Sequence, residues 1–306
     1  MLTALAGGVG AAKFLAGLAA VVEPSKITAI VNTGDDFELH GLAISPDLDT
    51  VTYTLAGAVN PETGWGLRGE TWTVMEELAA RGGQAWFRLG DRDLATHLYR
   101  TQRRREGAPL SQITAELAAS WDVGVRIVPM SDDPVETRVT VVGEGEIGFQ
   151  DYFVGRAHSV AVTSLRFAGA ERSEPAPGVL DALIGAERVI VCPSNPLVSI
   201  APILAVPGIE EALIKRREDA VAVSPIIAGA ALKGPADRML RELGHEPSVV
   251  GVARLYAPLV GTLIVDAADA GRASEVEGEG MRCVVSPTIM SGPAEAAALA
   301  RAVLAA

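Results

Sequence analysis

The N-terminal part of the chain alternates short apolar runs with a glycine-rich turn. Leu2–Ala6 is apolar and Ile27–Val31 is rich in β-branched residues, and each run is typical of a buried strand. Between them lie the glycine-rich residues 7–10 and the Ala- and Leu-rich stretch Ala11–Val22, which predicts a helix closed by Pro24. A strand, a glycine turn, a helix and a second strand are typical of the start of a doubly wound α/β sheet.

A long polar segment and a helical block interrupt this alternation. Asn32–Thr50 is predicted to be a polar loop, and loops of this length in compact chains are usually functional. The helical patterns that follow predict a helical cap, inserted into the sheet at about residues 47–121. The predicted helices of this block are Val51–Gly57, Glu70–Arg81, Asp91–Arg105 and Ser111–Trp121.

Strand patterns return after the helical block. Gly143–Glu146 separates two of them and indicates a hairpin. Because the chain has no repeats and no low-complexity linker, we predict one α/β domain over residues 1–306, a doubly wound, mostly parallel Rossmann-like sheet. The later strands are predicted at Val125–Pro129, Thr137–Val142, Ile147–Phe149, Ser159–Leu165, Arg188–Cys192, Ala220–Ser224, Thr262–Val265 and Met281–Val285, with a final helix from Pro293.

Composition narrows the class of protein. Hydrophobic residues make up 49% and charged residues 21%, which is typical of a globular chain. The net charge of −12 argues against nucleic acid and anionic membranes as partners. No apolar run is long enough for a membrane span and no basic region precedes the apolar N-terminus, so we expect a cytoplasmic protein. Cys192 and Cys283 offer neither a disulfide framework nor a metal-ligand spacing.

The glycine turn is the first candidate for chemistry. Glycines between a strand and a helix let a phosphate approach the amides at the helix N-terminus, so Gly8, Gly10 and Lys13 are predicted to bind substrate. The turn departs from a Walker A loop, since Ala12 precedes Lys13, and Lys13 also takes the third glycine position of the dinucleotide fingerprint. A merely tight turn and a solvated lysine are the alternatives.

Four aspartates gather in and just after the polar segment. Asp35, Asp36, Asp47 and Asp49 follow a predicted strand within a short stretch, and Mg²⁺ binds one or two carboxylates together with water and phosphate oxygens. We predict Asp35, Asp36 and Asp49 as metal ligands. The alternative is that Asp35 and Asp36 shape turns and that Asp49 caps the helix that begins near Thr50.

Leu89–Asp93 introduces a charged helix. Asp91 is predicted as its N-cap, and Asp93, His97, Arg100 and Arg104 then follow at helical spacing on one face. Such a face can hold an anionic or ring-bearing substrate, and it can equally be an exposed face laced by salt bridges.

Polar residues also follow later strands. Ser194 and Asn195 lie between two prolines, Ser224 precedes another proline, and Lys233–Pro235 lies further along. Ligands of open α/β sheets bind beyond the carboxyl ends of the strands, so Ser194, Asn195 and Ser224 are predicted to contact a nucleotide. Turn formation is the alternative interpretation.

Taken together, these motifs resemble the 2-phospho-L-lactate transferase (CofD-like) family of coenzyme F-420 biosynthesis. The resemblance runs over nearly the whole chain. Within the family, the chain looks most similar to the bacterial branch, the phosphoenolpyruvate transferases. The motifs occur in the order Gly7–Lys13, Asn32–Asp36, Ser45–Thr50, Gly64–Gly66, Leu89–Asp93 with Ala95–His97, Pro129–Asp133, Phe149–Asp151 and Pro193–Pro196.

The resemblance implies a reaction and its participants. In that family the ribityl hydroxyl of the deazaflavin Fo attacks a guanylylated 2-phospholactate or phosphoenolpyruvate, GMP leaves, and Mg²⁺ is required. It implies metal and acceptor-hydroxyl contact for Asp49, a catalytic role for Asp49 and Asp36, and acceptor binding by Arg88 or Arg92. Trp65 and the helix that carries His97 are expected to cap the deazaflavin ring. Asn32 and Thr33 are expected to contact substrate.

Two rival functions remain open at this stage. A nucleotide-sugar-binding regulator would share the glycine turn without the transferase motifs Pro46–Thr50 and Leu89–Asp93. An NAD-dependent oxidoreductase would place Asp35 on the ribose, but the glycine fingerprint is broken. A homodimer is one candidate assembly, and the choice between the phospholactyl and phosphoenolpyruvyl donor stays open.

Overall fold

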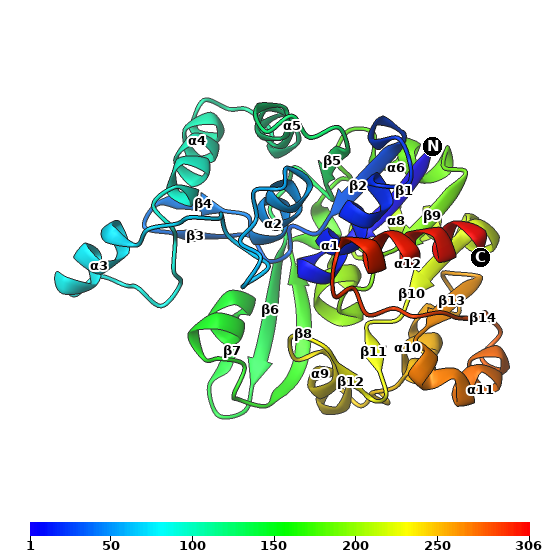
Figure 1. Ribbon diagram of the computed structural model, residues 1–306. Coiled ribbons are helices and arrows are strands. Elements are labelled where there is room, and N and C mark those ends of the chain that lie inside the picture. Colours follow the sequence, from blue (N-terminus) through cyan, green and yellow to red (C-terminus); the bar gives the residue numbers. More distant parts are fainter.

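Seven parallel strands form the centre of the protein, whose residues 1–306 are all described in a computed structural model (Figure 1). They are β1 (Leu2–Ala6), β2 (Ile27–Val31), β5 (Arg126–Pro129), β9 (Arg188–Val191), β10 (Ala220–Val223), β13 (Thr262–Val265) and β14 (Arg282–Val285).

The order of these strands is that of a doubly wound sheet. It reads β14-β13-β10-β9-β1-β2-β5, and every neighbouring pair is parallel. This is the Rossmann order with one further strand at the β14 edge. The predicted fold class, a mostly parallel Rossmann-like α/β sheet, is confirmed.

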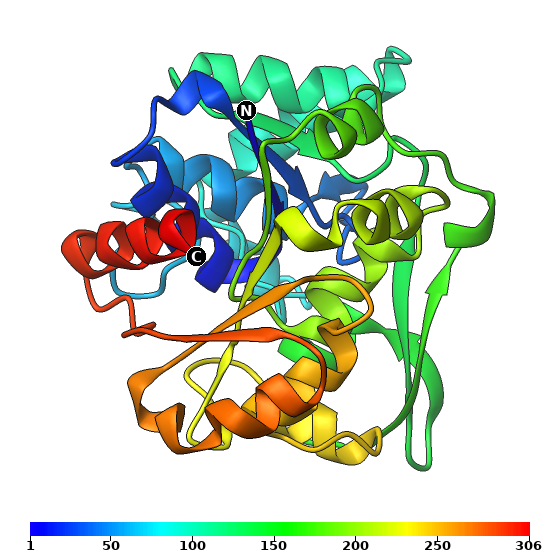
Figure 2. The ribbon, with the colours of Figure 1, turned by 90° about the vertical axis from the view of Figure 1, so that its right-hand side faces the viewer.

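The strands are apolar because the sheet is covered on both faces. Every residue of β1, β2, β10 and β13 is buried. Successive side chains along β1 enter different hydrophobic clusters, Ala4 on one face and Leu5 on the other. Figure 2 shows helices on both sides of the sheet.

Each face has its own set of helices. Those whose side chains join the Ala4 cluster are α1 (Gly8–Ala19), α2 (Pro46–Leu55), α5 (Leu110–Ser120) and α12 (Pro293–Ala305). Those that join the Leu5 cluster are α6 (Val179–Ile184), α7 (Ala201–Leu204), α8 (Ile209–Lys215), α9 (Ala236–Glu242), α10 (Val249–Tyr256) and α11 (Ala273–Gly278). No single helix is long and apolar enough to cross a membrane, and one bent pair, Pro196–Leu204 with Ile209–Lys215, meets that test of length and composition.

An arm projects from the body on the left of Figure 1. It holds the hairpin of β3 (Phe37–Leu39) and β4 (Leu42–Ile44), with α3 (Thr73–Ala80) and α4 (Asp93–Arg105). Its core is small and has four buried residues, Leu39, Ile44, Met75 and Leu89. The inserted helical cap at about residues 47–121 stays a prediction. Within that block α2 and α5 pack on the main sheet, while α3 and α4 belong to the arm.

The polar loop predicted over Asn32–Thr50 is wrong in part. It contains the β3–β4 hairpin, and α2 begins at Pro46 rather than after Thr50. Proline is favoured in the first turn of a helix because its missing N–H is not needed there. Asp47 and Asp49 therefore lie within the first turn of α2 and not in a loop.

The predicted hairpin at residues 143–146 is confirmed, and its strands form a separate sheet. β6 (Glu136–Val141) pairs antiparallel with β7 (Gly145–Gly148) and with β8 (Val162–Ala168). A further two-stranded hairpin, β11 (Ile226–Ile227) with β12 (Ala230–Ala231), follows β10. Both sheets lie below the central sheet in Figure 1 and help to surround the site described next.

Candidate active site

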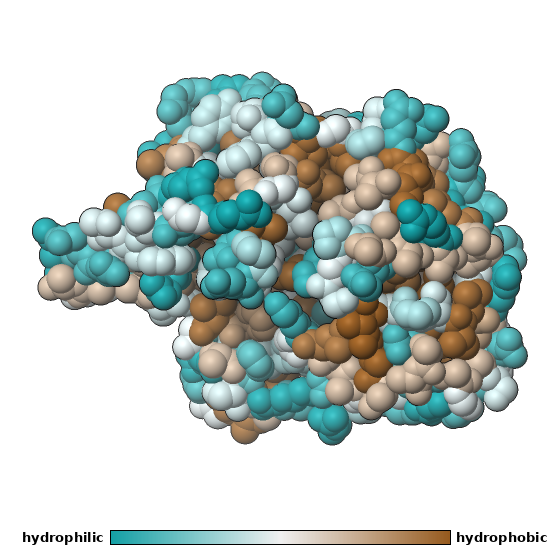
Figure 3. All heavy atoms as spheres, in the orientation of Figure 1, coloured by the Kyte–Doolittle hydropathy of each residue, from teal (hydrophilic) through white to brown (hydrophobic).

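A cavity of about 750 Å³ lies at the point where the strand order reverses. The chain leaves β1 and β9, which are neighbours, toward opposite edges of the sheet, and this reversal opens a crevice beyond their carboxyl ends. The hydroxyl of Ser194, after β9, donates a hydrogen bond of 2.8 Å to the carbonyl of Gly7, after β1. In Figure 3 this face of the molecule is hollowed near its centre.

Most of the residues predicted to form the site line this cavity. They are Gly8, Gly10, Lys13, Asp35, Asp49, Trp65, Arg88, His97, Ser194, Asn195 and Ser224. Four predicted residues do not line it: Asn32, Thr33, Asp36 and Arg92.

The four residues outside the lining have other places. Asn32 is buried beneath the glycine turn, where its amide supports Asp47, and Thr33 is buried after β2. Asp36 accepts a hydrogen bond of 2.6 Å from the hydroxyl of Ser45. The guanidinium of Arg92 donates to the carbonyl of Arg68 on the exposed side of the arm.

The glycine turn is already held by a carboxylate of this chain. Asp47 accepts hydrogen bonds from the amide of Gly8 (2.8 Å) and from the side-chain amide of Asn32 (2.9 Å). A side chain at Gly10 would lie 2.4 Å from the carbonyl oxygen of Pro193, so glycine is required for this close approach. Burial raises the pKa of Asp47 to about 6. The phosphate site predicted here must therefore share the start of α1 with Asp47.

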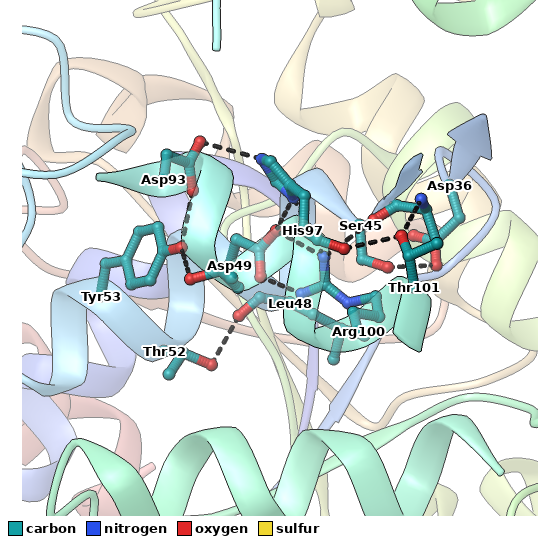
Figure 4. A network of polar contacts seen from close by, with 12 residues as sticks. Asp36, Ser45, Leu48, Asp49, Thr52, Tyr53, Asp93, His97, Arg100 and Thr101 are labelled. Carbon is teal, nitrogen blue, oxygen red and sulfur yellow. Dashed lines mark hydrogen bonds and ion pairs between the residues drawn. The ribbon is translucent and has the colours of Figure 1, made fainter. Parts of the chain in front are cut away.

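Asp49 is the centre of a buried polar network that joins α2 to α4 (Figure 4). Its carboxylate is paired with the guanidinium of Arg100, with one contact at 3.1 Å, and Arg100 is only 1% exposed. Nδ1 of His97 lies 3.3 Å from the same guanidinium, and Nε2 of His97 lies 3.1 Å from Asp93. The hydroxyl of Tyr53 donates to Asp93 at 2.6 Å.

This network decides two alternatives left open by the sequence. The α4 face carrying Asp93, His97 and Arg100 turns inward, while Arg104 is exposed, so the face is not a solvent-exposed salt-bridge ladder. The carboxylate of Asp49 binds Arg100 and not the amides of the first turn, so Asp49 is not a helix cap.

The predicted N-cap role of Asp91 at the start of α4 is wrong. Its carboxylate accepts from the amides of Thr73 and Val74, and so it caps α3. Glu70 in turn accepts from the amides of Arg92 and Asp93 at the start of α4. The two acids cap each other's neighbouring helix, because the turn between the helices brings both starts together.

Burial dominates the electrostatics of the acidic residues. Burial raises the pKa of Asp49, although Arg100 and His97 oppose this effect. Burial also raises the pKa of Asp35 well above its usual value, and the nearby Asp47 adds to the shift. At Asp93 burial is outweighed by hydrogen bonds from His97 and Tyr53, which hold its pKa below the usual value. A cation entering the cavity would offset the cost of these buried carboxylates.

Two features of this site fit a divalent cation. Asp49, Asp93 and His97 present ligand atoms that all lie within 4.8 Å of one another. Oδ1 of Asp35 is buried without a hydrogen-bond partner, and Asp35 lines the cavity together with His97, whose Nε2 faces Asp93. Carboxylate oxygens suit Mg²⁺, and an imidazole nitrogen also suits a transition metal such as Mn²⁺. The predicted ligands Asp35 and Asp49 thus face the cavity, whereas Asp36 lies behind it.

Asp36 makes the stability of the protein depend on pH. Burial raises its pKa to about 8. The folded state therefore keeps a proton that the unfolded state releases near pH 4, and stability falls as pH rises between these two values. Asp36→Asn, which mimics the protonated form, should remove this loss. We expect the difference in melting temperature, variant minus parent, to increase by roughly 2 °C or more for each pH unit between pH 5.5 and 7.5.

Melting curves of both proteins in chelator would check this pH dependence. Glu38→Gln is the matched control, since Glu38 is exposed on β3, which directly follows Asp36. Parallel curves for Asp36→Asn and the parent over this range would contradict the raised pKa.

Comparison with known proteins identifies the family. The family model described as 2-phospho-L-lactate transferase CofD matches residues 2–284. A phosphoenolpyruvate transferase of Streptomyces griseus is 49% identical over 98% of this chain and 96% of its own length. One from Mycolicibacterium smegmatis is 43% identical over 98% and 97%. The chain belongs to the CofD family.

Membership in the CofD family confirms the resemblance found in the motifs and makes the protein a transferase enzyme. It supports transfer of a phospholactyl or phosphoenolpyruvyl group in coenzyme F-420 biosynthesis. A crystal structure of a Bacillus halodurans protein shares the fold, with a TM-score of 0.65 and 15% identity over 99% of this chain and 98% of that one.

Several residues in and beside the cavity of this CofD-family protein were missed in the sequence. Arg100 and Asp93 were recognised only as part of a helix face, and Tyr53 gave no signal because it lies inside an ordinary helical pattern. Asp47 was noted as acidic, but its hold on Gly8 depends on the turn between β4 and α2. The helical spacing of Asp93, His97 and Arg100 was the one signal that could have found most of the network.

Proposed function

We propose that this protein transfers a phosphoenolpyruvyl or phospholactyl group from a guanosine diphosphate-linked donor to the ribityl hydroxyl of Fo, releasing GMP. The product is the dehydro form of coenzyme F-420-0 or coenzyme F-420-0 itself. The observation that carries this proposal is the position of Asp49. Its buried carboxylate is held by Arg100 and lines the same cavity as the glycine turn. The names of the curated relatives favour the phosphoenolpyruvyl donor.

The chemistry assigned to Asp49 follows from its surroundings. The acceptor oxygen forms a bond to the phosphorus that carries the acid, and the bond from that phosphorus to the oxygen of GMP breaks. Asp49 accepts the proton of the acceptor hydroxyl. Because burial raises the pKa of Asp49, it is a stronger base than an exposed aspartate. Arg100 and His97 fix the orientation of the carboxylate, which is the main contribution a protein makes to this type of transfer.

The metal proposal uses the cavity carboxylates. We propose that Mg²⁺ is held by Asp49 and Asp35, with Asp93 and His97 adjoining Asp49. When bound, such an ion neutralises charge on the donor phosphates. Asp36 supports the β4–α2 turn through Ser45 and is a positioning residue in this proposal, rather than the catalytic residue and metal ligand expected from the sequence.

The acceptor is proposed to bind on the arm side of the cavity. Arg88 lines the cavity, and its guanidinium stacks on the ring of Trp72 at 4.2 Å. Arg92 lies outside the lining and donates to the backbone carbonyl of Arg68. Arg88 is therefore the better candidate to hold Fo. Trp65 lines the cavity and is 46% exposed, so its ring is available to cover a deazaflavin.

The nucleotide is proposed to lie over the carboxyl end of β9. There Oδ1 of Asn195 accepts from the amide of Leu197, while Nδ2 contacts only the sulfur of Met239, at 3.9 Å. Nδ2 is thus the group available to a guanosine nucleotide. Ser224 lines the same part of the cavity, but its hydroxyl is bonded within its own turn, to the carbonyl of Ile226.

Replacing Asn195 should weaken binding of GMP. We expect Asn195→Ala to lose about tenfold in affinity by calorimetry, the effect of one hydrogen bond to a charged or polar ligand group. Asn195→Asp keeps the acceptor for Leu197 and removes the donor, so it should also lose GMP binding while it melts like the parent. If both variants bind GMP as the parent does, the nucleotide lies elsewhere. Equal binding of AMP and GMP by the parent would rule out a guanosine preference.

Acceptor-dependent release of GMP tests the proposed function. The protein is incubated with guanylylated phosphoenolpyruvate and Mg²⁺, with and without Fo, and GMP is measured by chromatography. The proposal predicts release only when Fo is present. Equal release without Fo would indicate hydrolysis of the donor, and no release in either case, with retained nucleotide binding, would favour a binding protein.

A further inference from the structure

Two segments far apart in the chain meet beside the cavity. Nζ of Lys233 donates a hydrogen bond of 3.3 Å to the carbonyl oxygen of Thr63, across 170 residues of sequence. Residues 63, 65 and 66 line the cavity from one segment, and residues 231–236, which follow the β11 strand, line it from the other. The contact between Lys233 and Thr63 joins these two parts of the cavity wall.

The segment around Thr63 is held by hydrogen bonds at its base and packs beside Val9 at its tip. Val59 and Leu67 pair as an isolated bridge, and the amide of Asn60 donates to the carbonyl of Gly66. A side chain at Gly64 would lie 2.8 Å from Val9 and 3.8 Å from Nζ of Lys233. The ammonium of Lys233 is therefore close to the turn at the start of α1, beside which Trp65 is exposed.

Lys233 is one of few positive charges in an acidic cavity. Asp35, Asp47, Asp49 and Asp93 line it, and the lysines and arginines among its lining residues are Lys13, Arg88 and Lys233. Arg88 is stacked on Trp72. Lys233 is exposed and takes part in none of the ion pairs of the structure, and its bond to Thr63 uses one of its three N–H donors. Two donors therefore remain for an anion in the cavity.

We propose that Lys233 is a further donor-binding residue: its ammonium binds an anionic oxygen of the donor. This inference rests on the proposed function, because that function supplies the anionic donor. The anionic oxygen belongs either to a phosphate of the nucleotide or to the carboxylate of the transferred acid. In both cases Lys233 acts on the donor rather than on Fo.

Lys233→Met tests this assignment, with Lys215→Met as the matched control. Lys215 is exposed on α8, outside the cavity lining, and its replacement changes the net charge equally. We expect Lys233→Met to raise the KM for the donor by about tenfold or more, the effect of one charge-assisted hydrogen bond, with the KM for Fo within about twofold of the parent. Lys233→Arg should keep most of the donor affinity. Lys215→Met should match the parent.

A binding measurement separates the two anionic sources and needs no turnover. GDP affinity is measured by calorimetry in the parent, in Lys233→Met and in Lys215→Met. Weaker GDP binding in Lys233→Met than in Lys215→Met supports phosphate contact. Unchanged GDP binding with a raised donor KM supports contact with the acid.

Three results would overturn the assignment to Lys233. The first is a donor KM and a GDP affinity in Lys233→Met equal to those of Lys215→Met. The second is an equal increase in the KM for the donor and for Fo. The third is a lowered melting temperature that accounts for the loss of donor affinity. Failure of the proposed function differs from these, because there the parent itself would not transfer the group. In that case unchanged GDP binding by Lys233→Met would also overturn the phosphate contact.

Discussion

Asp49→Asn is expected to lower turnover by about 100-fold or more, the effect of losing a positioned base or a contact made in the transition state. The substitution keeps the shape of the side chain but removes the charge that faces both the cavity and Arg100. Because it leaves the buried guanidinium without its partner, it should also cost stability, about 3–5 kcal/mol for breaking a buried pair. Turnover and melting temperature must therefore be measured together.

A double variant separates these two effects. Asp49→Asn combined with Arg100→Gln places two neutral amides where the ion pair was, so most of the stability lost in the single variant should return. If Asp49 acts on the acceptor, turnover of the folded double variant stays about 100-fold or more below the parent. Turnover that recovers along with the melting temperature would show that Asp49 is only the partner of Arg100.

Removal of divalent cations is expected to lower turnover by about 100-fold or more, and added Mg²⁺ should restore it. The donor is an anionic diphosphate, and it must enter a cavity already lined by Asp35, Asp47, Asp49 and Asp93. Without a cation these charges repel each other at short range in a buried site. The measurement is initial rate against free Mg²⁺ after treatment with chelator.

Asp35→Asn sharpens the test of the metal. Oδ1 of Asp35 is buried and lacks a hydrogen-bond partner, so its replacement should raise the Mg²⁺ concentration needed for half-maximal rate. Asp132→Asn is a suitable control, because Asp132 binds Ser111 away from the cavity. Full turnover in excess chelator, with no metal found on the protein by elemental analysis, would contradict a metal requirement.

The central sheet was predictable because its signals are local. Buried parallel strands such as Ile27–Val31 have an apolar pattern that depends on little beyond their own residues. The cavity followed from the same logic, since the residues after β1 and β9 must meet where the strand order reverses. Ser194, Asn195, Gly8 and Gly10 were found in this way.

The polar network was not predictable to the same degree because it depends on tertiary packing. The sequence around Asp49 is also compatible with a helix cap. Asp49 pairs with Arg100 only because α4 packs beside α2 in the fold. The exchange of caps between Asp91 and Glu70 likewise requires two helix starts to be adjacent. Asp36 and Arg92 have the right residue type for the site, but local turns point them elsewhere.

The most direct test of the proposed transfer is the mass of the product formed from Fo. The protein is incubated with Fo, Mg²⁺ and either guanylylated phosphoenolpyruvate or guanylylated 2-phospholactate, and the deazaflavin products are resolved by liquid chromatography and mass spectrometry. The proposal predicts Fo with one added phospho-acid group, formed faster from the phosphoenolpyruvate donor, together with an equal amount of GMP. Unmodified Fo with both donors, in a preparation that binds GMP and Mg²⁺, would contradict it.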